Sequence, residues 1–211
     1  MNRQARTGLL IVFEGTDGTG KSTQLQLLGH FLRIQGYPVI TTREPTTGRY
    51  GREIRSLYLH RDKYSREEEL ELFLADRREH VQSLVGPALC QGKIVLCDRY
   101  FLSTAAYQGA RGFDPEEILS RNRFAPDPDL ALLFQVPLDT GIKRITSGRG
   151  DTLNDFEQRD NLEKVAAIFS SIKRTYIQPI DASGSIEEVH REVVEYVKPL
   201  LPVLSSIGFK S

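Results

Sequence analysis

The segment from Gly15 to Ser22 constrains the fold more than any other part of the chain. It reads Gly-Thr-Asp-Gly-Thr-Gly-Lys-Ser and matches the pattern G-x-x-x-x-G-K-[ST]. An apolar run, Leu9 to Phe13, precedes it, and a helical pattern from about Ser22 to Gln35 follows it. Glycines let backbone N–H groups turn inward around an anion, and a helix N-terminus adds partial positive charge. The sequence therefore predicts a phosphate-binding loop between a buried strand and a helix.

The polar residues of this loop have predicted tasks in binding a nucleoside triphosphate. Lys21 is placed to reach the β- and γ-phosphates, and Ser22 to ligate Mg²⁺. The alternative is a glycine-rich turn that matches the pattern by accident, which the flanking strand and helix make rare. A loop of this kind does not separate kinases, switches and motor proteins. We expect an ATP site built from Gly15, Thr16, Asp17, Gly18, Thr19, Gly20, Lys21, Ser22 and Thr23.

Short apolar or β-branched runs recur along the chain and alternate with helical patterns. They are typical of strands buried on both faces, and their ranges are Leu9–Phe13, Val39–Thr42, Ile94–Cys97, Leu130–Val136 and, as a weaker fifth, Ile177–Ile180. The alternation implies right-handed crossovers and a parallel sheet with helices on both faces. We expect an α/β fold, a P-loop NTPase three-layer sandwich with a five-stranded parallel sheet, and ligands at the carboxyl ends of its strands.

Capping patterns mark three helix starts, which are Ser65 with Glu68, Ser185 with Glu188, and Asp114 with Pro115. The segment from Thr146 to Asp155 differs in texture, because Ser, Gly, Asp and Asn cluster there without an apolar rhythm. It predicts a mobile loop, a short lid at about 146–155, between two helices. No repeat or linker is evident elsewhere, so residues 1–211 are expected to form a single domain.

Charge and composition restrict the partners of the chain. Lys plus Arg total 28 and Asp plus Glu total 28, so no global field attracts nucleic acid or an anionic membrane. The longest early apolar run, Leu9 to Phe13, is too short for a membrane span or a signal peptide. Of the two cysteines, Cys97 is expected to be a buried thiol rather than part of a disulfide with Cys90. These features favour a cytoplasmic protein with no nucleic-acid or membrane partner.

The third run ends in Cys97-Asp98-Arg99-Tyr100, at the sheet edge where the phosphate-binding loop also opens. A carboxylate at Asp98 is suited to holding Mg²⁺ through water. The planar guanidinium of Arg99 can bind a second phosphate bidentately beside the metal, which favours a kinase over a hydrolase. The alternative is a solvated Asp and Arg that simply end a strand.

With these residues in place, the chain resembles the thymidylate kinase family of P-loop nucleoside monophosphate kinases, from about Leu9 to Val197. The resemblance implies Mg·ATP as phosphoryl donor, dTMP as acceptor and a homodimer. It rests on spaced motifs, which are Phe13-Glu14-Gly15, Thr42-Arg43-Glu44-Pro45, Leu72-Phe73-Leu74-Ala75-Asp76-Arg77, Asp98-Arg99-Tyr100, Ser103-Thr104-Ala105-Ala106-Tyr107-Gln108-Gly109 and Pro128-Asp129-Leu130.

The resemblance implies a pocket for the acceptor nucleotide. Phe73 corresponds to the aromatic residue that stacks on thymine, and Arg77, one helical turn later, to a donor for a thymine carbonyl or a nearby phosphate. Arg99 corresponds to the arginine that clamps the dTMP phosphate, and Arg55 to a second arginine reaching the same group. Read without the resemblance, Phe73 has core packing as its alternative, and Arg77 a surface ion pair.

Four further positions are implied in the same way. Thr104 and Gln108 correspond to residues facing the base or the sugar, and Tyr107 to an aromatic residue set against the sugar, where it disfavours a 2′-hydroxyl. Asp17 corresponds to a carboxylate that orients the acceptor through its 3′-hydroxyl. The alternatives are a core tyrosine for Tyr107 and an exposed loop aspartate for Asp17.

Members of this family place a catalytic arginine either in the P-loop or in the lid. The P-loop of this chain holds no arginine, which resembles the bacterial type, so the charge must come from elsewhere, and the candidates lie in and beside the lid. Arg149 is the first candidate and Arg144 the second. The sequence departs from the common family pattern after Pro45, where the usual Gly-Gly-Thr is replaced by Thr46-Thr47-Gly48-Arg49-Tyr50-Gly51.

The catalytic residues expected from these patterns are Lys21, Asp17, Arg99 and Arg149, with Ser22 and Asp98 as the Mg²⁺ ligands. The function expected is phosphoryl transfer from Mg·ATP to dTMP. Two alternatives stay open, a kinase for another nucleoside monophosphate or a deoxynucleoside, and a nucleotide-binding switch. The switch is disfavoured because the chain has no Asn-Lys-x-Asp guanine motif.

Overall fold

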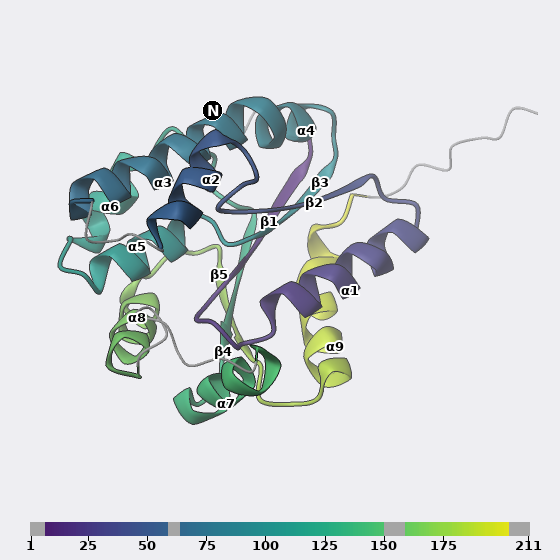
Figure 1. Ribbon diagram of the computed structural model, residues 1–211. Helices are drawn as coiled ribbons and strands as arrows, with labels where there is room; N and C mark the ends of the chain where they lie inside the picture. Colours follow the sequence, from purple (N-terminus) through teal and green to yellow (C-terminus); the bar gives the residue numbers. More distant parts are fainter. Residues whose placement is uncertain (1–6, 59–63, 150–158, 203–211) are drawn as a thin grey trace, which may run out of the picture.

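The computed structural model describes residues 7–58, 64–149 and 159–202, which form helices around one sheet (Figure 1). Within these ranges, five parallel strands lie in the order β2-β3-β1-β4-β5. Their bounds are β1 Leu9–Glu14, β2 Val39–Arg43, β3 Ile94–Asp98, β4 Leu130–Gln135 and β5 Ile177–Asp181. The predicted α/β class and parallel sheet are confirmed, and every predicted strand ends within one residue of the observed end.

Burial of the strands follows their place in the sheet. The central strands β1, β3 and β4 are almost fully buried, as the apolar runs indicated. Strand β2 lies at the edge and is only partly buried, so the expectation that Val39–Thr42 is buried on both faces was wrong. The reason is that a run of β-branched residues predicts a strand but not its place in the sheet, and only the topology decides whether the strand is central or at an edge.

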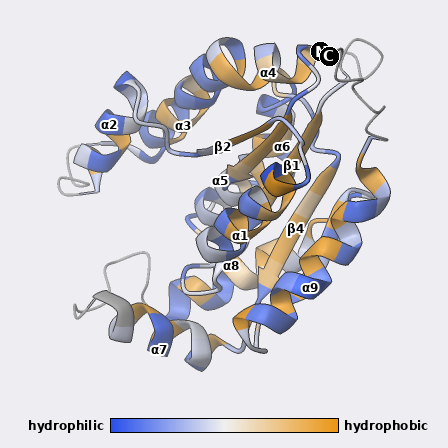
Figure 2. Cartoon of the chain, turned by 90° about the vertical axis from the view of Figure 1, so that its right-hand side faces the viewer, coloured by the Kyte–Doolittle hydropathy of each residue, from blue (hydrophilic) through white to orange (hydrophobic). Residues whose placement is uncertain are grey.

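Helices cover both faces of the sheet (Figures 1 and 2). One face carries α1 Lys21–Ile34 and α9 Ile186–Val197. The other face carries α3 Arg66–His80, α4 Gly86–Cys90, α5 Phe101–Gly109 and α8 Arg159–Ser171. The remaining helical segments are α2 Arg49–Leu57, α6 Pro115–Arg121, α7 Leu138–Arg149, a π-helical turn Val81–Val85 and a 3₁₀ turn Lys198–Leu200.

Alternate residues of β1 anchor the two cores. Leu10 and Val12 face the cluster beneath α3, α4, α5 and α8, whereas Ile11 and Phe13 face the cluster beneath α1 and α9. Phe13 also stacks on Phe134 of β4, with 5.7 Å between ring centroids. All four β1 side chains are fully buried, so the segment that follows this strand starts from a rigid position.

The predicted helix starts are confirmed. Ser65 and Ser185 both form complete capping boxes, each accepting a hydrogen bond from the backbone of the glutamate three residues later. Asp114 accepts from the backbone N–H of Glu116 ahead of α6. These caps satisfy N–H groups that a helix start would otherwise leave without a partner.

The first residues of the predicted lid are helical. The sequence placed a loop from Thr146, but α7 continues through Arg149, so the first residues of that segment are helical. Thr146 supports the extension because its Oγ1 donates to the carbonyls of Ile142 and Lys143, a pattern that lets a polar residue stay in a helix. The rest of the predicted lid, residues 150–155, lies outside the described residues.

Two further expectations concern the cysteines and the membrane. Cys97 is fully buried and Cys90 is exposed, and both are free thiols. In the described part of the chain, no helix combines the length and the apolar character needed to cross a membrane.

Candidate active site

The P-loop, Gly15–Ser22, joins the carboxyl end of β1 to α1, as the sequence predicted. Gly15, Gly18 and Gly20 have positive φ angles of 131°, 77° and 88°. A Cβ atom on Gly15 would collide with the carbonyl oxygen of Phe134, so glycine is needed where the loop passes β4. Helix α1 starts at Lys21, with Thr23 exposed in its first turn, and its unpaired N–H groups lie at the loop.

Lys21 is buried, and its side chain folds back over the P-loop. Its Nζ donates to the carbonyl of Thr16 at 2.6 Å and to Thr19 Oγ1 at 3.3 Å. Burial, and next the positive charge of Arg99, lower the pKa of Lys21 to about 8. A phosphate beside the amine would favour its charged form, so the site strengthens this charge when it binds an anion.

Ser22 and Asp98 meet where α1 begins and β3 ends. Ser22 Oγ donates to Asp98 Oδ2 at 2.5 Å, so the hydroxyl and the carboxylate can serve one cation. Mg²⁺ prefers oxygen ligands, keeps several waters and takes few ligands from the protein when phosphates supply others. The pair fits this chemistry. No cluster of three or more His, Cys, Asp or Glu side chains suited to a metal occurs in the described ranges.

Arg99 lies directly after β3 and faces the P-loop. Its backbone has a φ of 68°, a left-handed conformation rare for a side chain of this size, and its N–H donates to the carbonyl of Phe13 at 2.9 Å. Its guanidinium donates to Gly15 O at 3.2 Å, Ser103 Oγ at 3.0 Å and Asp17 Oδ1 at 2.8 Å. Three parts of the chain, β1, the P-loop and α5, thereby fix one cation.

Tyr107 completes a three-residue cluster with Asp17 and Arg99. Its hydroxyl donates to Asp17 Oδ2 at 3.0 Å, and its ring lies under the Arg99 guanidinium at 5.1 Å. Burial would raise the pKa of Asp17, but Arg99 and Lys21 outweigh it and hold that pKa well below its usual range. Asp17 is thus an ionised member of the site, and its reading as a plain exposed loop residue was wrong.

Arg77 lies on α3 and is 1% exposed, so its reading as a surface ion pair was wrong. Its Nε donates to Glu44 Oε2 at 2.8 Å, its Nη1 to Asn122 Oδ1 at 2.6 Å and its Nη2 to Thr104 Oγ1 at 3.0 Å. Glu44 also binds His80 Nδ1 at 2.9 Å. A buried network therefore fixes the guanidinium and ties it to Thr104 on α5.

Phe73 occupies the turn of α3 before Arg77. It is half-buried, and it is not among the residues that form or line the two apolar clusters of the described ranges, although Leu70 and Leu74 belong to one. Part of its ring is therefore open to a ligand, which favours the predicted stacking role over core packing. Gln108, four residues after Thr104 on α5, is 1% exposed and donates from Nε2 to Glu69 Oε1 at 2.8 Å.

Arg55 lies against the segment that departs from the family pattern after Pro45. Its guanidinium donates to the carbonyls of Pro45 at 3.3 Å and Thr46 at 2.7 Å. Thr46 is held in turn by Asp76, which accepts from its backbone N–H at 2.9 Å and from its hydroxyl at 2.6 Å. The altered segment is thus ordered by α3, and the reach of Arg55 to an acceptor phosphate stays a prediction.

The comparison with protein families decides between the functions that the sequence analysis left open. A family model described as thymidylate kinase matches residues 13–193 of this chain, which covers the P-loop, β3 and the α3–α5 residues. The chain belongs to the thymidylate kinase family.

Members of this family resemble the chain over most of its length. A thymidylate kinase of Desulfotalea psychrophila is 61% identical over 194 residues, which span 92% of this chain and 96% of that protein. Thymidylate kinases of Xanthomonas campestris pv. campestris and Xanthomonas oryzae pv. oryzae are 45% and 44% identical over 185 residues, which span 88% of this chain and 81% of theirs.

The two arginine candidates, Arg144 and Arg149, both lie on α7, and the structure gives a contact for Arg144. Arg144 donates from Nη1 to the carbonyl of Ala182 at 3.0 Å, so its guanidinium is tied to the residue that follows β5. Arg149 is the last residue of α7. Its catalytic role stays a prediction for this member of the thymidylate kinase family.

Sequence reasoning missed several buried carboxylates that hold the site together. Glu14 ends β1 and is fully buried, and it accepts from the backbone N–H groups of Tyr100 at 2.9 Å and Ser103 at 3.2 Å and from the Ser103 hydroxyl. Burial raises the pKa of Glu14, against hydrogen bonds that lower it. Two signals were available for Glu14, namely that it interrupts an otherwise apolar run and that it stands in the motif Phe13-Glu14-Gly15. Glu44 and Glu69 play comparable parts beneath Arg77 and Gln108.

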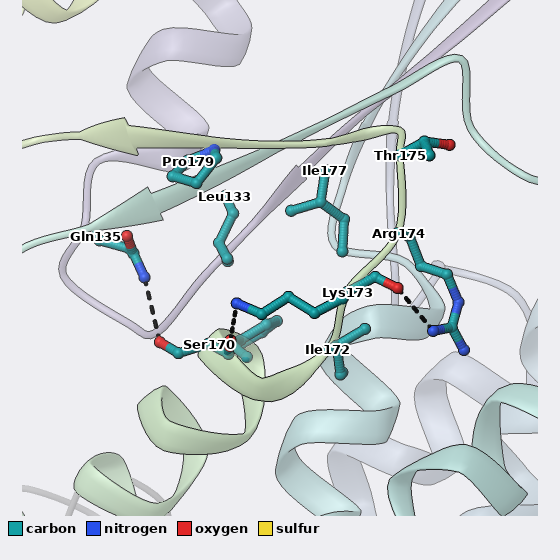
Figure 3. Close-up of a pocket in the computed structure, with 10 residues that line it drawn as sticks. Leu133, Gln135, Ser170, Ile172, Lys173, Arg174, Thr175, Ile177 and Pro179 are labelled. Carbon is teal, nitrogen blue, oxygen red and sulfur yellow. Dashed lines mark hydrogen bonds between the residues drawn. The ribbon is translucent and has the colours of Figure 1, made fainter.

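Two pockets differ in their relation to these residues. A pocket of about 200 Å³ lies beside the P-loop and is lined by Thr16, Asp17 and parts of α7 and α8. A larger one, of about 480 Å³, opens between β4, β5 and the end of α8 (Figure 3). Its lining includes none of the predicted site residues. Both of its cations have partners within the chain, because Lys173 Nζ lies 2.6 Å from Ser170 O and Arg174 binds the carbonyl of Lys173 and the carboxylate of Glu116. The smaller pocket thus adjoins the P-loop, whereas the larger one lies apart from the predicted site residues.

Proposed function

We propose that this chain catalyses phosphoryl transfer from Mg·ATP to dTMP, giving dTDP and ADP. The observation that carries the proposal is one arrangement at the carboxyl ends of β1 and β3. There Lys21 lies in the P-loop, Ser22 meets Asp98, and Arg99 is paired with Asp17. Phosphoryl transfer between two phosphates requires a phosphate-binding loop, a pair of ligands for a metal cation and a separately fixed arginine.

The donor is held by the P-loop. Backbone N–H groups of the loop and of the start of α1 bind the ATP phosphates, and Lys21 neutralises charge on the transferring group. Ser22, and Asp98 through water, would hold Mg²⁺, which would offset the negative charge of the phosphates. Residues Gly15–Thr23 therefore orient the γ-phosphate toward the side where Arg99 lies.

The acceptor phosphate is held by Arg99. Two anionic reactants repel each other strongly where water is excluded, so a cation between them is physically required. Arg99 meets this need because Gly15, Ser103 and Asp17 fix its guanidinium before the acceptor arrives. No general base is needed, since a monophosphate oxygen is already ionised. Arg55 is proposed as a second cation for the same phosphate.

The base and sugar are recognised from α3 and α5. Phe73 stacks on thymine, and Thr104, whose oxygen accepts from Arg77, keeps a hydroxyl proton that it can donate to a thymine carbonyl. Gln108, on the same face of α5 as Thr104, faces the base, and Tyr107 lies against the sugar. Asp17, held by Tyr107 and Arg99, accepts from the 3′-hydroxyl.

Three finer points belong to the same proposal. Arg149 supplies the lid charge, with Arg144 as the second candidate, and lid closure excludes water from the transfer. The resemblance to the family implies a homodimer, which light scattering of the purified chain would test. The balanced charge and free thiols support a cytoplasmic protein without a nucleic-acid partner.

The deciding experiment is a coupled ADP-release assay with Mg·ATP and a panel of acceptors, namely dTMP, dUMP, UMP, dCMP, AMP, GMP and thymidine. We expect dTMP to lead by about tenfold or more in kcat/KM. Lys21→Met, prepared in parallel, should abolish turnover and so assign the activity to this P-loop. If another acceptor has the highest kcat/KM, the assignment as a kinase is retained, and the assignment of Phe73, Arg77 and Thr104 to thymine binding is rejected.

A further inference from the structure

Helices α3 and α5 pack together and are joined by two buried side-chain hydrogen bonds. Glu69, Phe73 and Arg77 follow one another at four-residue spacing, so they share one face of α3. Opposite them, Thr104 and Gln108 share one face of α5. Arg77 binds Thr104 and Glu69 binds Gln108, so the two bonds bracket the half-buried ring of Phe73.

The amide of Gln108 has a defined orientation in this arrangement. Its Nε2 donates to Glu69 Oε1 at 2.8 Å, while its Oε1 is buried with no hydrogen-bond partner among the described residues. An ionised carboxylate only accepts hydrogen bonds, so the amide nitrogen must face Glu69 and the amide oxygen must face away. A buried acceptor without a partner costs free energy, which a donor on a ligand would recover.

Glu69 is itself held in place by an ion pair. It is 1% exposed and forms an ion pair with Arg111, which follows α5 and is 21% exposed. The Arg111 guanidinium offsets the cost of burying this carboxylate and holds it in place. Arg111 therefore helps to fix the acceptor that the Gln108 amide nitrogen faces.

We propose that Glu69 is a specificity-determining positioning residue, which fixes the Gln108 amide so that its oxygen meets the N3–H of the acceptor base. The inference rests on the proposed function and deepens it. Thymine and uracil carry a donor at N3, whereas cytosine carries an acceptor there, which would face the Gln108 oxygen. Glu69 thus excludes cytosine nucleotides without touching them, by denying Gln108 the flipped orientation that cytosine needs.

The test is the substitution Glu69→Gln. A glutamine at 69 can accept from or donate to Gln108, so both orientations of the Gln108 amide become available. We expect the ratio of kcat/KM for dTMP to that for dCMP to fall about tenfold, mainly through KM for dTMP. Glu67→Gln is the matched control, because Glu67 lies on the same helix and also pairs with an arginine, Arg121, but at the surface. It should leave the ratio unchanged.

Coupling to Gln108 separates positioning from a merely structural role. In a Gln108→Ala background, Glu69→Gln should have no further effect on the ratio, because the group through which it acts is gone. If Glu69→Gln does not fold, Glu69→Gln combined with Arg111→Gln removes both members of the ion pair and leaves no buried charge alone. Isothermal titration of dTMP and dCMP onto each variant provides a readout independent of turnover.

The outcomes distinguish this inference from the proposed function. A wild-type chain that does not prefer dTMP contradicts both. A wild-type chain that prefers dTMP, with an unchanged ratio in the Glu69 variants or an equal effect in the Gln108→Ala background, overturns the role of Glu69 alone. A lowered ratio that vanishes in that background supports it.

Discussion

Asp17 and Arg99 form an ion pair between the P-loop and the end of β3, with Asp17 Oδ1 2.8 Å from Arg99 Nη2. The pair joins the loop that holds one phosphate to the cation that is proposed to hold the other. Burial would lower the pKa of Arg99, but Tyr107, Asp17 and other acidic groups raise it further above its usual range, so the guanidinium stays charged. The position of the P-loop and the position of the acceptor cation are therefore coupled.

Replacing Arg99 with lysine tests this coupling. Arg99→Lys keeps the charge but loses the planar fork that reaches Gly15, Ser103 and Asp17. We expect kcat/KM for dTMP to fall about 100-fold, a loss typical when one preorganised donor is removed. Steady-state kinetics with dTMP varied at saturating ATP is the measurement. The control Arg121→Lys alters a surface arginine that also pairs with carboxylates, and activity within twofold of Arg121→Lys would contradict the assignment.

Lys21 should give ATP binding a pH dependence. Its pKa of about 8 means that the amine loses its proton, and its attraction for phosphate, as the pH rises above that value. We expect the Kd for ATP to rise about tenfold between pH 7 and pH 9. Lys21→Arg stays charged over this range and should flatten the profile, whereas the surface control Lys198→Arg should keep it. Titration calorimetry at several pH values gives the answer.

The same shift predicts the sign of a stability effect. The pKa of Lys21 lies below the ordinary lysine value of 10.5, so between about pH 8 and 10.5 the unfolded chain binds more protons than the folded one. This group therefore makes the free energy of unfolding rise with pH across that window. The Tm difference between wild type and Lys21→Met should grow in favour of wild type from pH 8 to pH 10. A difference that shrinks would show that the folded pKa is not lowered.

Asp98 should set the need for magnesium. In Asp98→Asn one ligand loses its charge, while Ser22 keeps its hydroxyl. We expect the Mg²⁺ concentration that gives half-maximal activity to rise about tenfold, with partial rescue at high Mg²⁺. Asp139→Asn removes a surface carboxylate paired with Arg159 and serves as the control. If Asp98→Asn lowers activity equally at all Mg²⁺ concentrations, Asp98 has another role.

Glu44 should matter for both stability and acceptor binding. It binds Arg77 and His80 in a site that excludes water, so Glu44→Gln leaves a buried guanidinium without its counter-charge. We expect a loss of about 2–4 kcal/mol in the free energy of unfolding and a higher KM for dTMP. Urea unfolding and steady-state kinetics measure the two effects. Glu195→Gln, at an exposed ion pair on α9, should change neither.

Much of the fold followed from the sequence, because the signals are local. Apolar runs bounded by polar residues gave all five strands, and side chains that cap their own helix gave the starts at Ser65, Asp114 and Ser185. The P-loop could be placed because its glycines require left-handed backbone that few other residues adopt. Failures occurred where a polar texture was taken for a loop, since Thr146 can satisfy its hydroxyl within α7.

The sequence also determined which residues are proposed to bear the chemistry, since Lys21, Ser22, Asp98 and Arg99 stand in motifs of defined spacing. Only the tertiary structure decided how they are held. Asp17 and Tyr107 lie 90 positions apart, and Glu69 and Gln108 lie 39 apart, yet each pair shares a hydrogen bond. Such pairs depend on how parallel strands bring loop and helix ends together. Burial then makes each contact strong, because a polar group that is buried without a partner costs free energy. No local sequence pattern encodes which residues are buried in this way.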